Sequence, residues 1–224
     1  MTKPTAAVLY FPGTNSHLET MVAFERAGAK AELLFLTDVL NGTKTLDSCD
    51  VLCIPGGFSF GDHLGAGALA GAYLREELQG QLSAASEKPL IAICNGFQIA
   101  MRSGVFGPDV TLDINESGTF HHAMYQRHIV DQTTNCVWLD GLSNDELRFP
   151  CAHGEGRFRF TSRDGWQPAL RYPDDDNPDG STDNIAGVTT PNNLVLGLMN
   201  HPERLLSDQR NQQIFRNGVR AAQG

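Results

Sequence analysis

The chain has 224 residues, with 17 basic and 26 acidic side chains and a formal net charge of −9. Because phosphate backbones and anionic lipids attract positively charged surfaces, this balance argues against nucleic acid or a membrane as a partner. The sequence shows no secretory leader and no apolar run long enough to span a bilayer, and its five cysteines are irregularly spaced. We therefore expect a cytoplasmic chain with reduced thiols, folded as a single domain over residues 1–224 without a structural metal.

The first half of the chain alternates short apolar runs with helical patterns. The apolar runs predict buried strands at residues 6–11, 31–36, 51–54 and 89–93. The patterns between and after them predict helices at residues 17–28, 67–86 and 95–102. Strands that are apolar throughout and separated by helices are typical of a parallel sheet covered on both faces. The sequence thus predicts an α/β, flavodoxin-like doubly wound fold with a mostly parallel sheet.

The second half has a looser pattern and no internal repeat or low-complexity linker. It predicts a hairpin of residues 184–189 and 194–199 around a Pro-Asn-Asn turn, and a final helix at residues 206–220. Further extended segments are predicted at residues 119–130, 135–139 and 157–161.

Cys94 is the strongest candidate nucleophile. It stands between a predicted buried strand and a predicted helix, where a sharp turn lifts a side chain above the edge of the sheet. Gly96 permits the close backbone approach of such a turn, and the start of the helix stabilises a thiolate. The other four cysteines are interpreted as buried structural thiols.

A thiol nucleophile needs a base and a group that orients the base. His201 and Glu203, separated by Pro202, directly follow a predicted strand, and the proline keeps the backbone of His201 extended. His153 is the rival base, although the glycines on its C-terminal side favour a binding loop.

A Gly-Gly turn at Gly56 and Gly57 ends another predicted strand. Backbone N–H groups there can point into the crevice at the sheet edge and stabilise an oxyanion, together with the N–H of Asn95. The strand ends before Gly56, Cys94 and His201 should meet at one edge of the sheet.

Five segments, in the same order along the chain, resemble the glutaminase part of phosphoribosylformylglycinamidine synthases, within the class I glutamine amidotransferases. The resemblance covers nearly the whole chain, and the combination of CNGFQ with AHGEG is specific to that family. The segments are PGGFSFGD (55–62), ICNGFQI (93–99), AHGEGRF (152–158), NPDGSTDNIAGV (177–188) and LGLMNHPER (196–204).

The resemblance implies a role for each matching residue. Cys94 would attack the side-chain amide of glutamine, His201 would transfer protons, and Glu203 would orient His201. The oxyanion would be held at Gly57 and Asn95. The amino-acid end of glutamine would be bound by Phe58, Gln98, His153, Gly154 and Glu155.

The resemblance also implies partners. Ammonia would pass to a separate synthetase subunit that uses ATP and Mg²⁺, with a small accessory subunit as a further candidate partner. The glutaminase half-reaction would need no metal or organic cofactor in this chain. Relatives often carry arginines where Gly65, Ile114 and Ala123 stand here, so these departures concern the surface that faces the partner.

Two other functions stay open at this point. A cysteine peptidase or deglycase can use a similar strand–Cys–helix turn, but such proteins generally lack the His-Pro-Glu ending. A non-catalytic, glutamine-sensing subunit is the second alternative, and the complete triad argues against it. His121, His122 and His128 are interpreted as surface histidines rather than metal ligands, and residues 174–183 as a solvated turn rather than a calcium loop.

Overall fold

The computed structural model describes residues 2–142 and 146–224, so Met1 and residues 143–145 of the predicted domain lie outside the described residues. In the described part, nine strands form one sheet in the order β2-β1-β3-β4-β11-β10-β9-β6-β7, and β5 and β8 form a small separate ribbon. One half of the large sheet is parallel and the other half is antiparallel.

The parallel half contains the predicted strands. The strands pair in parallel from β2 through β1, β3 and β4 to β11. All residues of β3, β4 and β11 are buried, as expected for strands covered on both faces. The bounds are β1 Thr5–Tyr10, β2 Lys30–Phe35, β3 Val51–Ile54, β4 Leu90–Ile93 and β11 Val195–Leu198.

The antiparallel half extends the same sheet beyond β11. The hairpin predicted around Pro-Asn-Asn is confirmed, because β10 pairs antiparallel with β11. The sheet then continues through β9 and β6 to β7 at its edge. The bounds here are β5 Val110–Asp113, β6 His121–Val130, β7 Glu146–His153, β8 Arg157–Phe160, β9 Gln167–Arg171 and β10 Ile185–Thr189.

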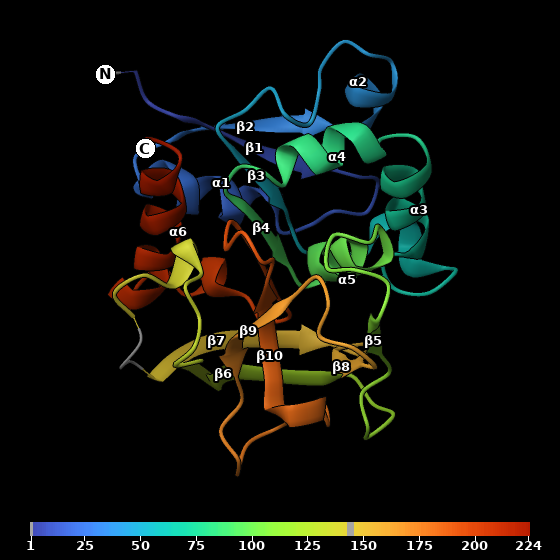
Figure 1. The fold of residues 1–224 in the computed structure, drawn as a ribbon, viewed down its shortest axis with the longest axis vertical. Helices are drawn as coiled ribbons and strands as arrows, with labels where there is room; N and C mark the ends of the chain where they lie inside the picture. The colour runs from blue at the N-terminus through green and yellow to red at the C-terminus, as the bar shows by residue number, and fades with distance from the viewer. Residues whose placement is uncertain (1, 143–145) are drawn as a thin grey trace.

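The helices form two groups around the parallel strands (Figure 1). Helices α1 and α6 contact each other on one side, and α3 contacts both α4 and α5 on the other, which is the doubly wound arrangement. The bounds are α1 His17–Arg26, α2 Leu36–Leu40, α3 Ala68–Glu76, α4 Gln79–Ala85, α5 Asn95–Arg102 and α6 Gln209–Ala221.

Two predictions about local structure were wrong. The single helix predicted at residues 67–86 is two helices, α3 and α4, interrupted at Glu77 and Leu78. The extended segment predicted at residues 135–139 contains a 3₁₀ turn, η2 (Val137–Leu139), whose buried Trp138 donates to the Leu194 carbonyl oxygen, next to the start of β11. Strand β7, which the sequence did not predict, ends directly before the glycines interpreted as a binding loop.

The turn at residues 174–183 is solvated at its surface, as predicted, but also has a buried polar interior. Asp175 is exposed and pairs with Arg127 at 2.8 Å. Asp179, by contrast, is completely buried, and its carboxylate accepts hydrogen bonds from the Ser181 hydroxyl and the Tyr172 hydroxyl.

Candidate active site

The turn between β4 and α5 raises Cys94 above the edge of the sheet. Cys94 has φ 53° and ψ −113°, a conformation that costs energy for a residue with a Cβ and that marks a nucleophile elbow. The turn brings the start of α5 very close to β3, and only glycine permits this approach. A Cβ on Gly96 would overlap the Ile54 carbonyl oxygen. The Cys94 Sγ lies 3.7 Å from the Ala152 carbonyl oxygen of β7.

His201 and Glu203 form a buried hydrogen-bonded pair beside Cys94. The His201 Nδ1 is 2.6 Å from the Glu203 Oε1, and the ring also hydrogen-bonds the Cys94 side chain. Both side chains are almost completely buried. Desolvation lowers the pKa of His201, but the charges of Glu203 and Cys94 outweigh it, and the pKa rises to about 10.

The backbone at Gly56 and Gly57 closes the site from β3. A Cβ on Gly56 would lie 2.8 Å from the His201 Cε1 and 3.4 Å from the Cys94 Cβ, so only glycine fits between the two side chains. Gly57 lies opposite Thr14 in an antiparallel bridge. The hydrogen bonds of this bridge come from the residues on either side of each: the Phe58 N–H donates to Gly13, and the Asn15 N–H donates to Gly56. The Gly57 N–H therefore points away from Thr14.

Two backbone N–H groups are available to an oxyanion. Among the hydrogen bonds of the described residues, neither the Gly57 nor the Asn95 N–H donates to a protein acceptor. Asn95 is the first residue of α5, where N–H groups have no intrahelical partner and carry the positive end of the helix dipole. The arrangement can stabilise negative charge next to Cys94.

The Asn95 side chain holds the loop that follows Gly57. Its Oδ1 accepts from the Ser59 N–H at 2.9 Å, and its Nδ2 donates to Asp62 and Gln98 at 3.2 and 3.0 Å. The Asp62 carboxylate in turn accepts from the Gly67 N–H. Our sequence interpretation missed this role of Asp62; its only signal is its place in the PGGFSFGD segment.

The residues expected to bind glutamine come from α5, from the turn after β7 and from the loop after β3. The Gln98 side chain donates to the Glu155 carbonyl oxygen at 2.8 Å, and the Glu155 carboxylate lies 3.2 Å from the Ala66 N–H. Gly154 lies next to the Phe120 ring, and Phe58 is 51% exposed. The structure therefore brings Gln98, Gly154 and Glu155 together, with Phe58 on the exposed rim.

His153 is placed differently from its predicted role. Its ring is buried beneath Gly156 and lies 3.3 Å from the Asn115 Oδ1, and desolvation lowers its pKa to about 4. This position shapes the Gly154–Gly156 turn from below and does not favour a side-chain contact with glutamine. As a rival base, His153 lacks the carboxylate pairing that His201 has, since its Nε2 is 4.0 Å from the Asp179 Oδ2.

Other parts of the described chain offer no competing chemical site. All five cysteines are free and buried, and burial raises the pKa of Cys49, Cys53, Cys136 and Cys151. No group of three or more His, Cys, Asp or Glu among the described residues could hold a metal ion. In the same part of the chain, no helix has the length and apolarity needed to cross a bilayer.

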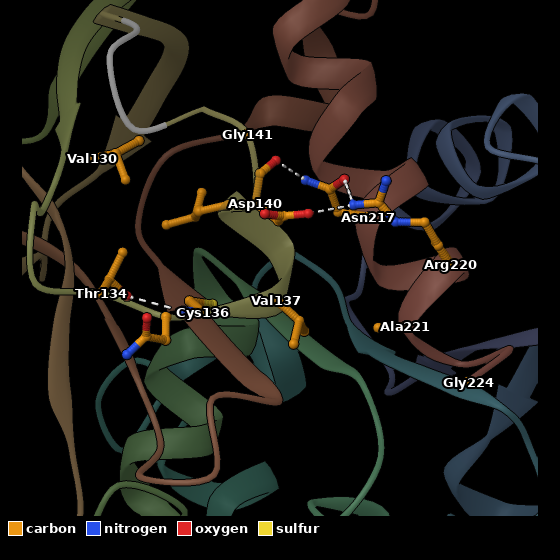
Figure 2. A pocket seen from close by; sticks show the side chains of 12 residues that line it. Val130, Thr134, Cys136, Val137, Asp140, Gly141, Asn217, Arg220, Ala221 and Gly224 are labelled. Atoms are coloured by element: carbon orange, nitrogen blue, oxygen red, sulfur yellow. Dashed lines mark hydrogen bonds and ion pairs between the residues drawn. The ribbon is translucent and has the colours of Figure 1, made fainter.

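A cavity of about 600 Å³ lies away from the triad, between η2 and the end of α6 (Figure 2). Its polar side chains already bind each other: Asn217 donates to the Asp140 carbonyl oxygen, and Arg220 pairs with the Asp140 carboxylate at 2.6 Å. The candidate active site is the group of residues that meet at the ends of β3, β4 and β11.

Comparisons with known proteins agree with this geometry. The family described as the CobB/CobQ-like glutamine amidotransferase domain matches residues 3–222, so the chain belongs to the glutamine amidotransferases. This membership sets aside the peptidase and deglycase alternative.

Individual relatives indicate which glutamine amidotransferases this chain resembles. The phosphoribosylformylglycinamidine synthase subunit PurQ of Dehalococcoides mccartyi is 32% identical over 92% of this chain and 87% of its own length. The subunit of the same name from Pyrobaculum aerophilum is 38% identical over 88% of this chain and 86% of its own length. The solved structure of PurLQS from Thermotoga maritima contains a chain that is 31% identical, with a TM-score of 0.83, and the match covers 98% of this chain and 99% of that one.

Proposed function

We propose that this chain is the glutaminase subunit of a phosphoribosylformylglycinamidine synthase in purine biosynthesis. It hydrolyses glutamine to glutamate and ammonia through a cysteinyl thioester and supplies the ammonia to a separate ATP-dependent synthetase subunit. The observation that carries the proposal is the convergence of Cys94, the His201–Glu203 pair and two unused backbone N–H groups at one sheet edge. The match to PurQ subunits over nearly their full length supports the choice among amidotransferases.

The first half of the reaction forms the thioester. The Cys94 sulfur attacks the side-chain carbonyl carbon of glutamine, and the N–H groups of Gly57 and Asn95 stabilise the negative oxygen of the tetrahedral intermediate. The raised pKa of His201 keeps its imidazolium form available, so it can give a proton to the departing nitrogen. Ammonia leaves, and a γ-glutamyl thioester remains on Cys94.

The second half regenerates the thiol. His201, now neutral, takes a proton from water, which attacks the thioester carbonyl carbon through a second oxyanion at the same N–H groups. Glutamate then leaves, and the proton returns to the Cys94–His201 pair. Because protein groups supply the nucleophile, the base and the oxyanion donors, this half-reaction needs no cofactor from this chain; ATP and Mg²⁺ belong to the proposed synthetase.

Substrate binding uses the turn that ends β7. The Glu155 carboxylate would bind the α-ammonium of glutamine, because a cation in a half-buried pocket needs a paired anion. Gln98 supports this carboxylate by donating to the backbone carbonyl of the same residue.

The rim of the site suits a protein partner. Phe58 and Leu64 follow β3, and Phe120 lies against Gly154. Each of these three residues is more than half exposed. Large apolar side chains grouped beside a site are typical of a docking surface. We assign this rim to the synthetase subunit. The PurLQS structure matched by this chain supports an assembly of this kind, with a small third subunit as a further candidate partner.

Two further parts of the proposal follow from the same observations. A single amidotransferase domain over residues 1–224 is supported by the family match to residues 3–222 and by one continuous core cluster. A cytoplasmic setting is supported by the five free thiols.

The decisive experiment measures glutamine-dependent amidine synthesis by the chain together with its co-purified synthetase. Cys94→Ala should abolish glutamine-dependent synthesis, whereas added ammonia should still support it, because the synthetase site is separate. A glutamine-like electrophile should label Cys94 in the wild-type chain, and Cys151→Ala, which removes a buried neighbouring thiol, should be labelled equally. Label on another cysteine, or full activity of Cys94→Ala, would refute the proposal.

A further inference from the structure

A buried amide lies directly before the catalytic histidine. Asn200 follows β11, precedes His201 and is completely buried. Its Nδ2 lies 2.8 Å from the Nε2 of His128, which is also completely buried and comes from β6, 72 residues away in the chain. The surface position predicted for His128 was therefore wrong.

The hydrogen bonds of His128 define which nitrogen carries the proton. Its Nδ1 is 2.9 Å from the Gln126 carbonyl oxygen, which can only accept, so the proton is on Nδ1. Burial lowers the pKa of this ring to about 3, so the ring is neutral and Nε2 has a free lone pair. Nε2 must accept, and Asn200 must therefore present its NH₂ group to His128. The histidine fixes the orientation of the amide.

His128 also contacts the second support of His201. The His201 N–H donates to the Pro150 carbonyl oxygen of β7 at 2.8 Å. The neighbouring residue, Phe149, stacks on the His128 ring with 4.5 Å between centroids, and Tyr172 packs on the same ring at 5.3 Å. One imidazole thus touches both segments that hold the backbone of His201: residue 200 on one side and residue 149 on the other.

We propose that His128 is a positioning residue for the catalytic base: by accepting from Asn200 and stacking on Phe149, it fixes the backbone of His201 so that the ring faces Cys94. The role rests on the proposed glutaminase function and acts within the same site. His128 itself does not touch substrate. Its loss should slow the chemical step more than it weakens glutamine binding, because its described contacts lead to the backbone of His201 rather than to Gln98 or Glu155.

The experiment compares variants of the full chain in the presence of the synthetase. His128→Phe keeps an aromatic ring against Phe149 but removes the acceptor, and should lower kcat for glutamine about tenfold with KM changed less than about twofold. His128→Gln places an acceptor oxygen at similar reach and should restore kcat to within about threefold of wild type. Asn200→Ala removes the same bond from the other end, together with the contacts of this amide with His153 and Tyr172, and should lower kcat at least as much as His128→Phe. It keeps the test informative if one variant folds poorly.

Val130→Ala is the matched control, because Val130 is buried on the same strand and its truncation destabilises the core without touching Asn200. It should leave kcat unchanged. The rate of Cys94 alkylation by iodoacetamide gives a second readout that needs no glutamine, and it should fall in His128→Phe and recover in His128→Gln.

The possible outcomes separate this inference from the proposed function. Wild-type kcat and alkylation rate in His128→Phe, or an equal loss in Val130→Ala, would overturn the positioning role while leaving the glutaminase intact. A wild-type chain that neither hydrolyses glutamine nor reacts selectively at Cys94 would instead overturn the proposed function.

Discussion

The protonation of His201 is set by two opposing effects at one residue. Desolvation favours the neutral ring, whereas the carboxylate of Glu203 at 2.6 Å and the Cys94 side chain favour the imidazolium. The charges dominate, and the pKa lies near 10. The His201 ring is therefore an imidazolium at neutral pH, and it can donate a proton to the leaving nitrogen of the proposed reaction.

This balance predicts how the triad variants behave. His201→Ala should lower kcat/KM by roughly 10²–10⁴, the usual contribution of a general acid–base. Glu203→Gln should be milder, and it should move the alkaline limb of the pH profile to lower pH, because removing an anion destabilises the imidazolium. The measurement is kcat/KM for glutamine between pH 6 and 10.

Glu76→Gln is the matched control for the charge change. Glu76 pairs with Arg75 at 2.7 Å on the exposed surface of α3, away from the His201–Glu203 contact, so the limb should stay in place. An alkaline limb that does not move in Glu203→Gln would contradict the electrostatic account of His201.

Single residues differ in how far sequence alone can define them. Cys94, His201 and Glu203 follow strand ends, and the geometry of a parallel sheet brings strand ends together, so their convergence could be predicted. His128 could not be placed, because its strand alternates only loosely and both faces carry polar side chains. The His128 ring is buried by the rings of Phe149 and Tyr172, which come from β7 and from the residue after β9, and sequence alone does not bring these segments together.

At the scale of elements, the start of α5 depends on one close crossing. The helix begins so near β3 that a side chain at Gly96 would overlap the Ile54 carbonyl oxygen. This crossing sets the height of Cys94 and of the Asn95 N–H above the sheet edge.

Replacing Gly96 by Ala therefore tests the crossing. We expect Gly96→Ala to destabilise the fold by roughly 2–4 kcal/mol and to abolish glutaminase activity, since backbone atoms must separate to admit the methyl group. Gly80→Ala is the control: Gly80 lies in α4, is exposed and has nothing within 4 Å of its added Cβ. It should stabilise by about 0.5–1 kcal/mol, as alanine does in helices. Urea unfolding measures both, and equal stability of the two variants would refute the crossing argument.

The elements that sequence analysis missed have physical reasons in common. Strand β7 contains Pro150, which cannot donate to a ladder and argues against a central strand, but β7 is at the edge of the sheet, where proline is tolerated. Strand β9 contains Pro168 and pairs with β10 through an irregular register. The break between α3 and α4 falls at Glu77 and Leu78, and neither residue is a glycine or a proline that would predict the end of a helix. The Leu78 side chain is buried at this change of direction.

At the scale of the whole molecule, the two halves of the sheet supply different groups of the candidate active site. The parallel half, predicted from sequence, supplies Cys94, His201 and the oxyanion donors. The antiparallel half, of which the sequence predicted the β10–β11 hairpin and the extended segment at residues 119–130 but not β7 or β9, supplies the Pro150 carbonyl for His201 and the turn that carries Glu155. Beneath it lies a buried polar layer that includes two neutral histidines, His128 and His153.

That polar layer predicts loss of stability in mild acid. Desolvation lowers the pKa of His128 to about 3 and that of His153 to about 4, whereas the unfolded chain titrates both near the usual histidine value of about 6.5. Below pH 6.5 the unfolded state therefore binds protons that the folded state does not. Each histidine should then lower the free energy of unfolding by about 1.4 kcal/mol per pH unit, until the pH reaches its folded pKa. Well below pH 6.5 His201 adds no further pH dependence, because it is then protonated in both the folded and the unfolded state.

Urea unfolding at pH 7, 6 and 5 measures the effect, and His128→Gln isolates one of the two histidines. The variant should be less sensitive to acid than the wild-type chain by about 1.4 kcal/mol per pH unit well below pH 6.5, because its amide does not titrate. Taking the difference between the two chains cancels the carboxylates, which titrate in both. His122→Gln is the control, since His122 is exposed and its replacement should leave the pH dependence unchanged. An identical slope for His128→Gln and wild type would mean that the His128 ring takes up its proton in the folded state, and the tautomer that orients Asn200 would then be lost.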